Sequence, residues 1–413
     1  MESLEAFGNR SREWLIDNAQ HRSLDADRTW GDGSDEVALF QFRNDTDERQ
    51  LLDARRAWVA CKADAGFANL SWDVEWGGQG LTPAHEELFA SIEAEFDVPA
   101  DPNETITITT KLIAPTIRVI GTEEQRRRFL RPMLRTDEMW CQLFSEPGAG
   151  SDLASLTTAA VRDGDEWRIS GQKVWTSGAQ FADWAYVLCR TDSSVPKHRG
   201  ITAFIVPMSS QGIEVRPLRQ MTGGASFNEV FFTDVRVPDE LRLGGVGDGW
   251  TVAVTTLSFE RNGFGPDGGV PDAAQRLIAL ARHEGREHDP LVRQALARAY
   301  IRQRIVELTC DRLRPNIGSE NAPGPEGSIG KMTWTVSLQA FNEAASIILG
   351  PKLIADAEQW GTYAWSAHVL GAPGYRIAGG SDEVQRNIIG ERILGLPSEP
   401  LPDRNLPFEQ VPR

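Results

Sequence analysis

The chain has 413 residues, which is too long for one ordinary hydrophobic core and predicts two or three domains. Its formal net charge of -16 argues against a nucleic-acid backbone or an anionic membrane surface as the main partner, because both would be repelled. The N-terminus has no apolar signal segment, and no uncharged stretch is as long as a membrane span, so we expect a cytoplasmic protein.

The first part of the chain reads mainly as helix, from about residue 48 to residue 119. Apolar residues recur there at intervals of three and four, and Gly66 is a plausible helix stop. Thr122 and Gln125 form a capping box that starts a further helix. By contrast, the polar and aperiodic stretch from Gln20 to Asp47 is expected to be an irregular surface segment.

Around Cys141 the pattern changes to short apolar runs separated by turn residues, which predicts strands. Asp163-Gly164-Asp165 marks a hairpin turn between two of them. This β region is followed by a second helical region, so the order is helical, then β, then helical.

Helical periodicity returns from Gly249 onward. Asp289 and Pro290 supply an N-cap and a first-turn proline, and Val292, Leu296 and Tyr300 follow at helical spacing along one expected face. The proline-rich tail after residue 396 is expected to be extended.

Cysteine and histidine usage gives no sign of a metal site. The cysteines, Cys61, Cys141, Cys189 and Cys310, lie far apart, and the 6 histidines are scattered. Neither pattern fits zinc ligation or a histidine-based triad. We therefore expect reduced, mostly buried thiols and no metal.

Three glycine-rich or aromatic stretches could carry chemistry. Residues 141–156, CQLFSEPGAGSDLASL, place glycines in a turn whose N–H groups could receive a phosphate or carboxylate, although such a turn is more often only a turn. In GQKVWTSGAQ, Trp175 offers a flat face and Thr176 a hydroxyl, which suits an aromatic heterocycle unless this tryptophan is merely a buried strand residue. Gly379 and Gly380 precede Ser381, a potential helix cap, and would let another molecule approach the backbone.

The ordered set FSEPGAGSD, KVWTSG and GGSDEVQRNIIGERILGLP resembles the acyl-CoA dehydrogenase family over roughly Trp58 to Pro397. The resemblance implies an α+β, three-domain architecture: an N-terminal helical domain (1–138), a middle β-barrel-like domain (139–245) and a C-terminal four-helix-bundle domain (246–413). It also implies an FAD flavoprotein that oxidises the Cα–Cβ bond of an acyl-CoA thioester and passes electrons to an electron-transfer flavoprotein.

The family pattern also implies which residues line the cofactor. Ser145 would lie near the pyrimidine end of the flavin, Trp175 would pack on the ring, and Thr176 would hydrogen-bond near N5. Ser151 would also meet the CoA chain. The implied cofactor-binding set is Gln142, Leu143, Phe144, Ser145, Gly150, Ser151, Trp175, Thr176, Ser177, Ser381, Asp382 and Glu383.

The reaction needs a general base for the α-proton, and burial of a carboxylate raises its pKa toward the working pH. In most of the family a glutamate precedes the glycine of the C-terminal loop, but here that position is Gly379. Glu260 followed by Arg261 resembles the isovaleryl and long-chain branches, whose base lies on an internal helix. Glu260 is therefore the expected base; the alternative is a structural ion pair with Arg261.

The same resemblance assigns substrate contacts to Ser151, Arg261, Gly379 and Gly380. In the family, the backbone N–H at the position of Gly379 polarises the thioester carbonyl, and a glycine keeps that N–H. The helix-breaking stretch from Gly263 to Pro271 could widen the acyl pocket for a bulky or branched group, or could be an ordinary surface loop.

Two stretches depart from the family pattern. The Arg-x-x-Phe-Gly element is missing from ALARHEGREHDPLVRQ, and the Gln-x-x-Gly-Gly element reads IILGP at residues 347–351. In the family both elements contact the cofactor of a neighbouring subunit. We therefore expect either a heterotetramer with a related subunit, as in bacterial steroid side-chain α2β2 enzymes, or a homo-oligomer with substitute contacts.

Two other functions stay open at this point. An acyl-CoA oxidase would differ by using oxygen as its acceptor. A catalytically silent partner subunit is favoured by Gly379 and opposed by Glu260.

Overall fold

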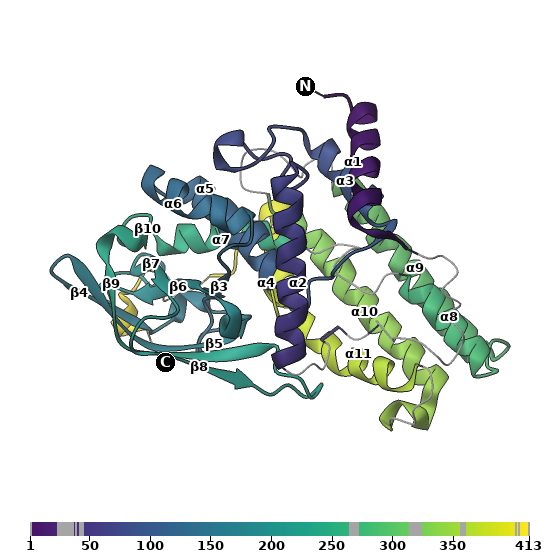
Figure 1. Cartoon of the computed structure of the whole chain (residues 1–413). Coiled ribbons are helices and arrows are strands. Elements are labelled where there is room, and N and C mark those ends of the chain that lie inside the picture. Colours follow the sequence, from purple (N-terminus) through teal and green to yellow (C-terminus); the bar gives the residue numbers. More distant parts are fainter. Residues whose placement is uncertain are drawn as a thin grey trace.

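The computed structural model describes residues 2–22, 37, 39–40, 45–263, 272–313, 324–355, 361–400, 403 and 405–411. Figure 1 shows three parts: an N-terminal group of helices, a β-sheet, and a C-terminal bundle of helices on the opposite side from the sheet. The expected α+β architecture in the order helical, β, helical is confirmed.

The N-terminal part is built from helices and two short strands. They are α1 (Leu4–Asn18), β1 (Gln20–His21), α2 (Asp45–Asp64), α3 (Pro83–Glu93), β2 (Phe96–Asp97), α4 (Thr105–Thr107), a π-helical turn (Ile108–Ile113), α5 (Ala114–Ile120) and α6 (Glu123–Leu134). Two predicted signals are confirmed. Gly66 adopts φ +77° just after α2, and Thr122 and Gln125 cap α6 reciprocally.

The expectation that residues 20–47 form only an irregular surface segment was wrong at three places. Gln20 and His21 pair with β2, Val37 is buried, and α2 already begins at Asp45. An isolated valine in a polar stretch carries no periodic signal, so its burial depends on a distant partner surface. The remaining residues of that stretch, 23–36, 38 and 41–44, lie outside the described part of the chain.

The middle part is a mixed sheet with strand order β10-β7-β6-β4-β5-β9-β8, and β3 pairs in parallel with β6. The predicted hairpin is confirmed, since Asp163 pairs with Glu166 around Gly164 and Asp165. The strands are β3 (Trp140–Leu143), β4 (Ala159–Asp163), β5 (Glu166–Ser177), β6 (Trp184–Arg190), β7 (Ile201–Pro207), β8 (Ile213–Leu218), β9 (Phe227–Pro238) and β10 (Arg242–Leu243).

The C-terminal part contains α7 (Gly249–Gly263), α8 (Ala273–His283), α9 (Pro290–Leu313), α10 (Gly327–Leu349), α11 (Thr362–Tyr375) and α12 (Asp382–Ile388). The predicted start of α9 is confirmed, because the Asp289 side chain accepts the Leu291 N–H at 2.9 Å. The expected apolar face was partly wrong: Val292 is buried, but Tyr300 is 45% exposed. Eight residues at about 100° each turn the helix roughly 80° past two full turns, which carries Tyr300 off that face.

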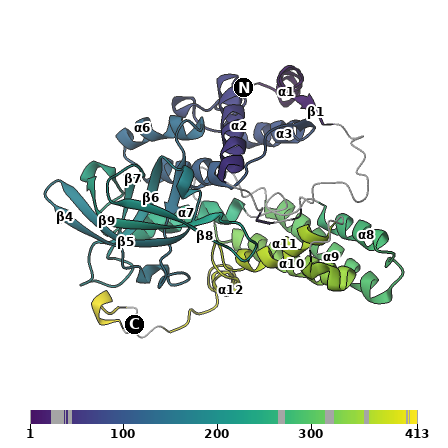
Figure 2. The ribbon, with the colours of Figure 1, turned by 60° about the horizontal axis from the view of Figure 1, so that its bottom comes forward.

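Helix α7 connects the sheet to the bundle (Figures 1 and 2). Its first half packs against β7 and α5, where Val252 and Ala253 are buried and the Thr256 hydroxyl meets that of Thr116 at 2.9 Å. Helix α7 also packs against α10. The helix that carries Glu260 thus contacts both parts of the molecule.

The C-terminal tail is extended and exposed over residues 397–400, as expected, but it then docks on the sheet (Figure 2). Phe408 is 3% exposed and its ring lies 3.9 Å from the Arg190 guanidinium. Its backbone N–H donates to Val195 at 2.9 Å.

Among the described helices, none combines the length and the apolar character that crossing a bilayer requires. The four cysteines are thiols; Cys141 and Cys189 are buried, Cys310 is half-buried and Cys61 is exposed. The expectation of mostly buried thiols therefore holds for two of them.

Candidate active site

Trp175 stands on an irregularity of strand β5. The pairing of β5 with β9 shifts between Lys173 and Thr176, and Trp175 has φ +63°, an unusual conformation for a large side chain. Bulges of this kind redirect a side chain, and the Trp175 ring is 62% exposed. The alternative interpretation, a buried strand tryptophan, does not describe this residue.

Thr176, directly after the bulge, is 1% exposed. Its hydroxyl oxygen is buried, and no described residue offers it a hydrogen-bond partner. A buried hydroxyl without a partner costs about 1–3 kcal/mol, so such groups are usually satisfied by something else. The pair of an exposed ring and an orphaned hydroxyl fits a flat heterocycle with a polar edge.

A row of aromatic contacts connects Trp175 to the helical bundle. The Trp175 ring meets Phe227 at 6.0 Å, Phe227 meets Phe40 at 5.5 Å, and Phe40 stacks on Tyr375 at 4.8 Å. Tyr375 ends α11, four residues before Gly379. The row brings the Trp175 region and the C-terminal glycine turn to the same side of the molecule. Sequence reasoning missed Phe40, which lies in a polar stretch without periodicity.

The glycine-rich loop after β3 is a tight turn, as predicted. Glu146 and Ala149 exchange backbone hydrogen bonds of 3.1 and 3.0 Å. A Cβ atom added at Gly148 or Gly150 would meet nothing within 4 Å, so both glycines face open space. The N–H groups of Gly150 and Ser151 have no acceptor among the described residues, which leaves them available to an anion.

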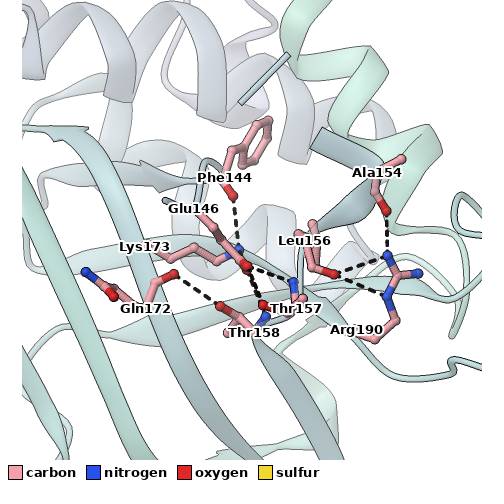
Figure 3. Close-up of polar contacts among 9 residues, drawn as sticks. All are labelled: Phe144, Glu146, Ala154, Leu156, Thr157, Thr158, Gln172, Lys173 and Arg190. Atoms are coloured by element: carbon pink, nitrogen blue, oxygen red, sulfur yellow. Dashed lines mark hydrogen bonds and ion pairs between the residues drawn. The ribbon is translucent and has the colours of Figure 1, made fainter. Parts of the chain in front are cut away.

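This loop is held from inside by a buried ion pair that sequence reasoning also missed. The Lys173 ammonium group lies 2.9 Å from Glu146 Oε1 and donates to the Phe144 carbonyl at 3.0 Å (Figure 3). The other donors to the Glu146 carboxylate are Thr157, through its N–H at 2.7 Å and hydroxyl at 2.8 Å, and the Thr158 N–H at 2.8 Å. Lys173 and Trp175 are on the same strand, so the pair fixes the loop relative to the exposed ring.

Burial by itself would raise the pKa of Glu146. The charge of Lys173 and the hydrogen bonds from Thr157 and Thr158 outweigh burial and lower this pKa to about 2. Glu146 is therefore a permanently charged structural group at neutral pH. A proton acceptor for catalysis needs a pKa nearer the working pH, so Glu146 does not suit that role.

The other predicted residues of this region differ in exposure. Gln142, Ser145 and Ser177 are half-buried, and Ser151 is exposed at the turn. Leu143 and Phe144 are buried, so their side chains belong to the hydrophobic core.

The second glycine turn lies between α11 and α12. Gly379 and Gly380 adopt φ +64° and +88°, conformations that favour glycine. The Gln385 side chain donates to both of their carbonyl oxygens, at 2.9 and 3.2 Å. The N–H groups of the two glycines have no acceptor among the described residues. Ser381 caps α12, as predicted, by accepting the Val384 N–H at 3.3 Å.

The two acidic residues after this turn are placed differently. Asp382 is 1% exposed, and its carboxylate accepts from Thr335 at 3.0 Å and from Arg376 at 2.7 Å. Glu383 has an exposed side chain and pairs with Arg386 at 3.3 Å. The Asp382 carboxylate is thus engaged within the fold.

Lys331 connects the glycine turn to the region of Glu260. It lies on α10, is fully buried, and its ammonium group donates to the Gly380 carbonyl. Burial lowers the pKa of Lys331 to about 8, although the charges of Asp382, Glu260 and Glu383 act to raise it. Glu260 is half-buried on α7. The structure therefore has a buried cation that binds the glycine turn and lies within electrostatic range of Glu260.

Two predicted features lie beyond this description. The side chain of Arg261 and the segment 264–271 are outside the described residues. In the described ranges, no group of three or more His, Cys, Asp and Glu side chains is arranged to hold a metal ion.

The two stretches that depart from the family pattern contact each other. Arg286, in the first stretch, donates to the carbonyls of Ile347 and Ile348, the latter at 3.1 Å, and to Asp289 at 2.6 Å. A cation at the last carbonyls of a helix is favourable, so Arg286 acts as a cap for α10.

Comparison with known proteins gives matches over most of the chain. Models of the acyl-CoA dehydrogenase N-terminal, middle and C-terminal domains match residues 37–137, 141–235 and 247–394. Acyl-CoA dehydrogenase IpdE1 from Mycobacterium tuberculosis is 37% identical over 402 residues, covering 97% of this chain and 99% of the relative. Acyl-CoA dehydrogenase FadE34 from the same organism is 39% identical over 342 residues, covering 81% of this chain and 45% of the relative.

Solved structures with the same fold include heteromeric assemblies. The Tcur3481-Tcur3483 steroid ACAD superposes with a TM-score of 0.74 at 27% identity, covering 97% of this chain and 99% of that chain. The ChsE4-ChsE5 complex from Mycobacterium tuberculosis superposes with a TM-score of 0.71 at 27% identity, with the same coverages.

The buried ion pair gives a prediction about stability. Lys173→Met leaves the Glu146 carboxylate buried without its cation, so we expect a loss of about 3–5 kcal/mol in the free energy of unfolding, measured by urea denaturation. Lys173→Met combined with Glu146→Gln removes both charges and should cost less than the single change. The control is Arg236→Met, which breaks an exposed pair with Glu166 and should cost at most about 1 kcal/mol. Equal losses in Lys173→Met and Arg236→Met would contradict a special role for the buried pair.

Proposed function

Because the chain belongs to the acyl-CoA dehydrogenase family, whose members are FAD flavoproteins that oxidise the CH–CH bond of acyl-CoA thioesters, we propose that Glu260 abstracts the α-proton and that the product is the trans-2-enoyl-CoA. The observation that carries this assignment is that Lys331, which donates to the Gly380 carbonyl, lies within electrostatic range of Glu260. Position 379 has no carboxylate, so the proposed base comes from another element, α7, which packs against the helix that carries Lys331.

The residues around Trp175 fit FAD. When bound, FAD supplies the hydride acceptor of the reaction. Trp175 would pack against the ring, and the orphaned hydroxyl of Thr176 would gain a partner at the polar edge of the ring. The free N–H groups of Gly150 and Ser151 would receive phosphate oxygens. Since the Asp382 carboxylate is already bound by Arg376 and Thr335, its residue would contribute through the backbone.

The glycine turn would hold the thioester carbonyl. The N–H groups of Gly379 and Gly380 are available, and their carbonyls are held by Gln385 and Lys331. As Glu260 takes the α-proton, negative charge develops on the thioester oxygen, where fixed donors stabilise it. One such donor is worth about a hundredfold to a thousandfold in rate.

Glu260→Gln tests the proposed base. The amide cannot accept the proton, so we expect bound flavin at the wild-type level but anaerobic bleaching by acyl-CoA slowed at least about a hundredfold. Glu214→Gln, an exposed change on β8, is the control and should bleach at the wild-type rate. Wild-type bleaching in Glu260→Gln would remove this residue from the mechanism and favour a catalytically silent subunit.

For the substrate, we infer a bulky or polycyclic acyl group in lipid or steroid degradation. The support comes from structural relatives described as a steroid enzyme and from the helix-breaking sequence after Glu260. We expect kcat/KM for a steroid side-chain or branched acyl-CoA to exceed that for butyryl-CoA by at least about tenfold, because a wide pocket leaves a short chain with few contacts. Steady-state kinetics with both thioesters checks this. A higher kcat/KM for butyryl-CoA would rule out the wide pocket.

For the partner, we infer a related subunit that completes the cofactor site, with an electron-transfer flavoprotein as the acceptor. Arg286, in the stretch that lacks the family's Arg-x-x-Phe-Gly element, caps α10 within this chain. Helix α9 also exposes an apolar stripe of Tyr300, Ile301, Ile305 and Leu308, as expected of an assembly surface.

Expression with and without the related subunit tests the assembly. We expect the chain alone to bind flavin weakly and the co-expressed pair to reach full occupancy, measured by the visible spectrum and by light scattering. Ile301→Asp should reduce the assembly mass, because a charge would be placed in the apolar stripe. Full flavin occupancy and turnover in the singly expressed chain would exclude an obligate partner.

A further inference from the structure

We propose that Lys331 is a positioning residue of this reaction: its ammonium group ties the glycine turn to α10 and keeps Glu260 in its ionised, proton-accepting form. The inference deepens the proposed function, because it rests on Glu260 as the base. It concerns a group that neither the sequence pattern nor the cofactor contacts account for.

The burial of Lys331 requires an explanation. Lysine is almost never fully buried unless it is paired, and Lys331 has no exposed surface. It lies within an apolar stretch of α10 in which Trp334 and Leu338 belong to the core. A leucine or methionine at position 331 would avoid the free-energy cost of burying a charge. A charge at this position therefore indicates a function beyond packing.

The first interaction of Lys331 is a hydrogen bond that helps to hold the glycine turn in place. Its ammonium group and the Gln385 amide both donate to the Gly380 carbonyl, while Gln385 also holds the Gly379 carbonyl. One turn further along α10, Thr335 binds Asp382. Helix α10 therefore holds the turn at two points. A hydrogen bond to a carbonyl also strengthens the N–H of the same peptide unit as a donor. The Gly379 carbonyl, held by Gln385, shares its unit with the Gly380 N–H. The Gly380 carbonyl, held by Lys331, shares its unit with the Ser381 N–H, so Lys331 acts on the Gly379 and Gly380 N–H groups by fixing the turn.

The second interaction of Lys331 is electrostatic and acts at longer range. Carboxylates from two elements act on the ammonium group: Glu260 from α7, and Asp382 and Glu383 from α12. Asp382 is already bound by Arg376, which follows α11, and Glu383 is exposed, where water screens its charge. No charged group from the described parts of α8 and α9 acts on Lys331. Glu260 is therefore the carboxylate through which Lys331 acts on the chemistry.

The sign of the effect follows from charge. A nearby cation favours the ionised form of a carboxylate and lowers the pH at which the carboxylate titrates. Only ionised Glu260 can accept the α-proton. The benefit of Lys331 is complete while its ammonium is protonated and is lost as the pH rises through about 8, the value to which burial lowers the Lys331 pKa. Removal of the cation should move the titration of Glu260 to higher pH.

A direct titration tests the inference without requiring the natural substrate. Flavin-loaded protein, labelled with carbon-13 at the glutamate side-chain carboxyl, gives one resonance that is absent from Glu260→Gln and therefore belongs to Glu260. In Lys331→Met we expect the titration midpoint of this resonance to rise by about one pH unit or more. An unchanged midpoint would overturn the proposal.

The matched control is Lys62→Met. Lys62 is also a buried lysine, paired with Glu93 at 2.9 Å, but it lies on α2 in the N-terminal part. Its loss should lower stability without moving the Glu260 midpoint. If Lys62→Met moves the midpoint as far as Lys331→Met, the effect is a general loosening of the fold and the proposal fails.

Lys331→Arg keeps the charge and provides a second measurement if the methionine variant does not fold. In the wild type the Glu260 resonance should show a further inflection near pH 8, as Lys331 loses its proton. In Lys331→Arg this inflection should disappear, because arginine stays protonated. If the inflection persists, Lys331 is not its source and the proposal is overturned.

Anaerobic bleaching separates this inference from the proposed function. If no thioester bleaches the wild type, the proposed function fails, whereas the titration still decides whether Lys331 and Glu260 are coupled. If the wild type is bleached, we expect Lys331→Met to slow the reaction at least tenfold at pH 7 and Lys331→Arg to restore part of the rate.

Discussion

The ion pair between Lys173 and Glu146 fixes the two segments against which the rest of the site is placed. Burying two charges is unfavourable unless every donor and acceptor is satisfied, and here Thr157, Thr158 and the Phe144 carbonyl complete the network. The result is a rigid connection between a loop with free N–H groups and a bulged strand with an exposed ring. Preorganised donors of this kind need no rearrangement when an anionic group arrives.

The sequence was sufficient for features that depend on near neighbours. Helix caps at Thr122 and Ser381, the Gly164 hairpin and the two glycine turns each involve residues within a few positions of one another. The contacts that were missed join distant segments: Glu146 to Lys173, Phe40 to Tyr375, and Lys331 to Gly380. A buried lysine looks like a surface lysine in a single sequence, and only packing distinguishes the two.

The proposed base illustrates how one fold can supply a catalytic group from different elements. Gly379 has no carboxylate but keeps its N–H, and in our proposal Glu260 on α7 serves as the proton acceptor instead. The internal cap formed by Arg286 is a second difference, because the stretch without the Arg-x-x-Phe-Gly element contacts helix α10 of its own chain. Both differences concern side chains, and the three-domain architecture of the family is kept.

The docking of Phe408 attaches the C-terminal tail to the β-sheet, at Arg190 of β6. The chain leaves α12, passes along the outside, and inserts Phe408 against Arg190, whose guanidinium also holds the Leu156 carbonyl at 3.3 Å beyond the Ser151 turn. The tail is therefore connected, through Arg190, to the segment that follows the loop with free N–H groups. For protein engineering, this makes the C-terminal end a poor place for affinity handles or surface immobilisation, whereas α1 lies on the far side of the molecule from the tail (Figure 2).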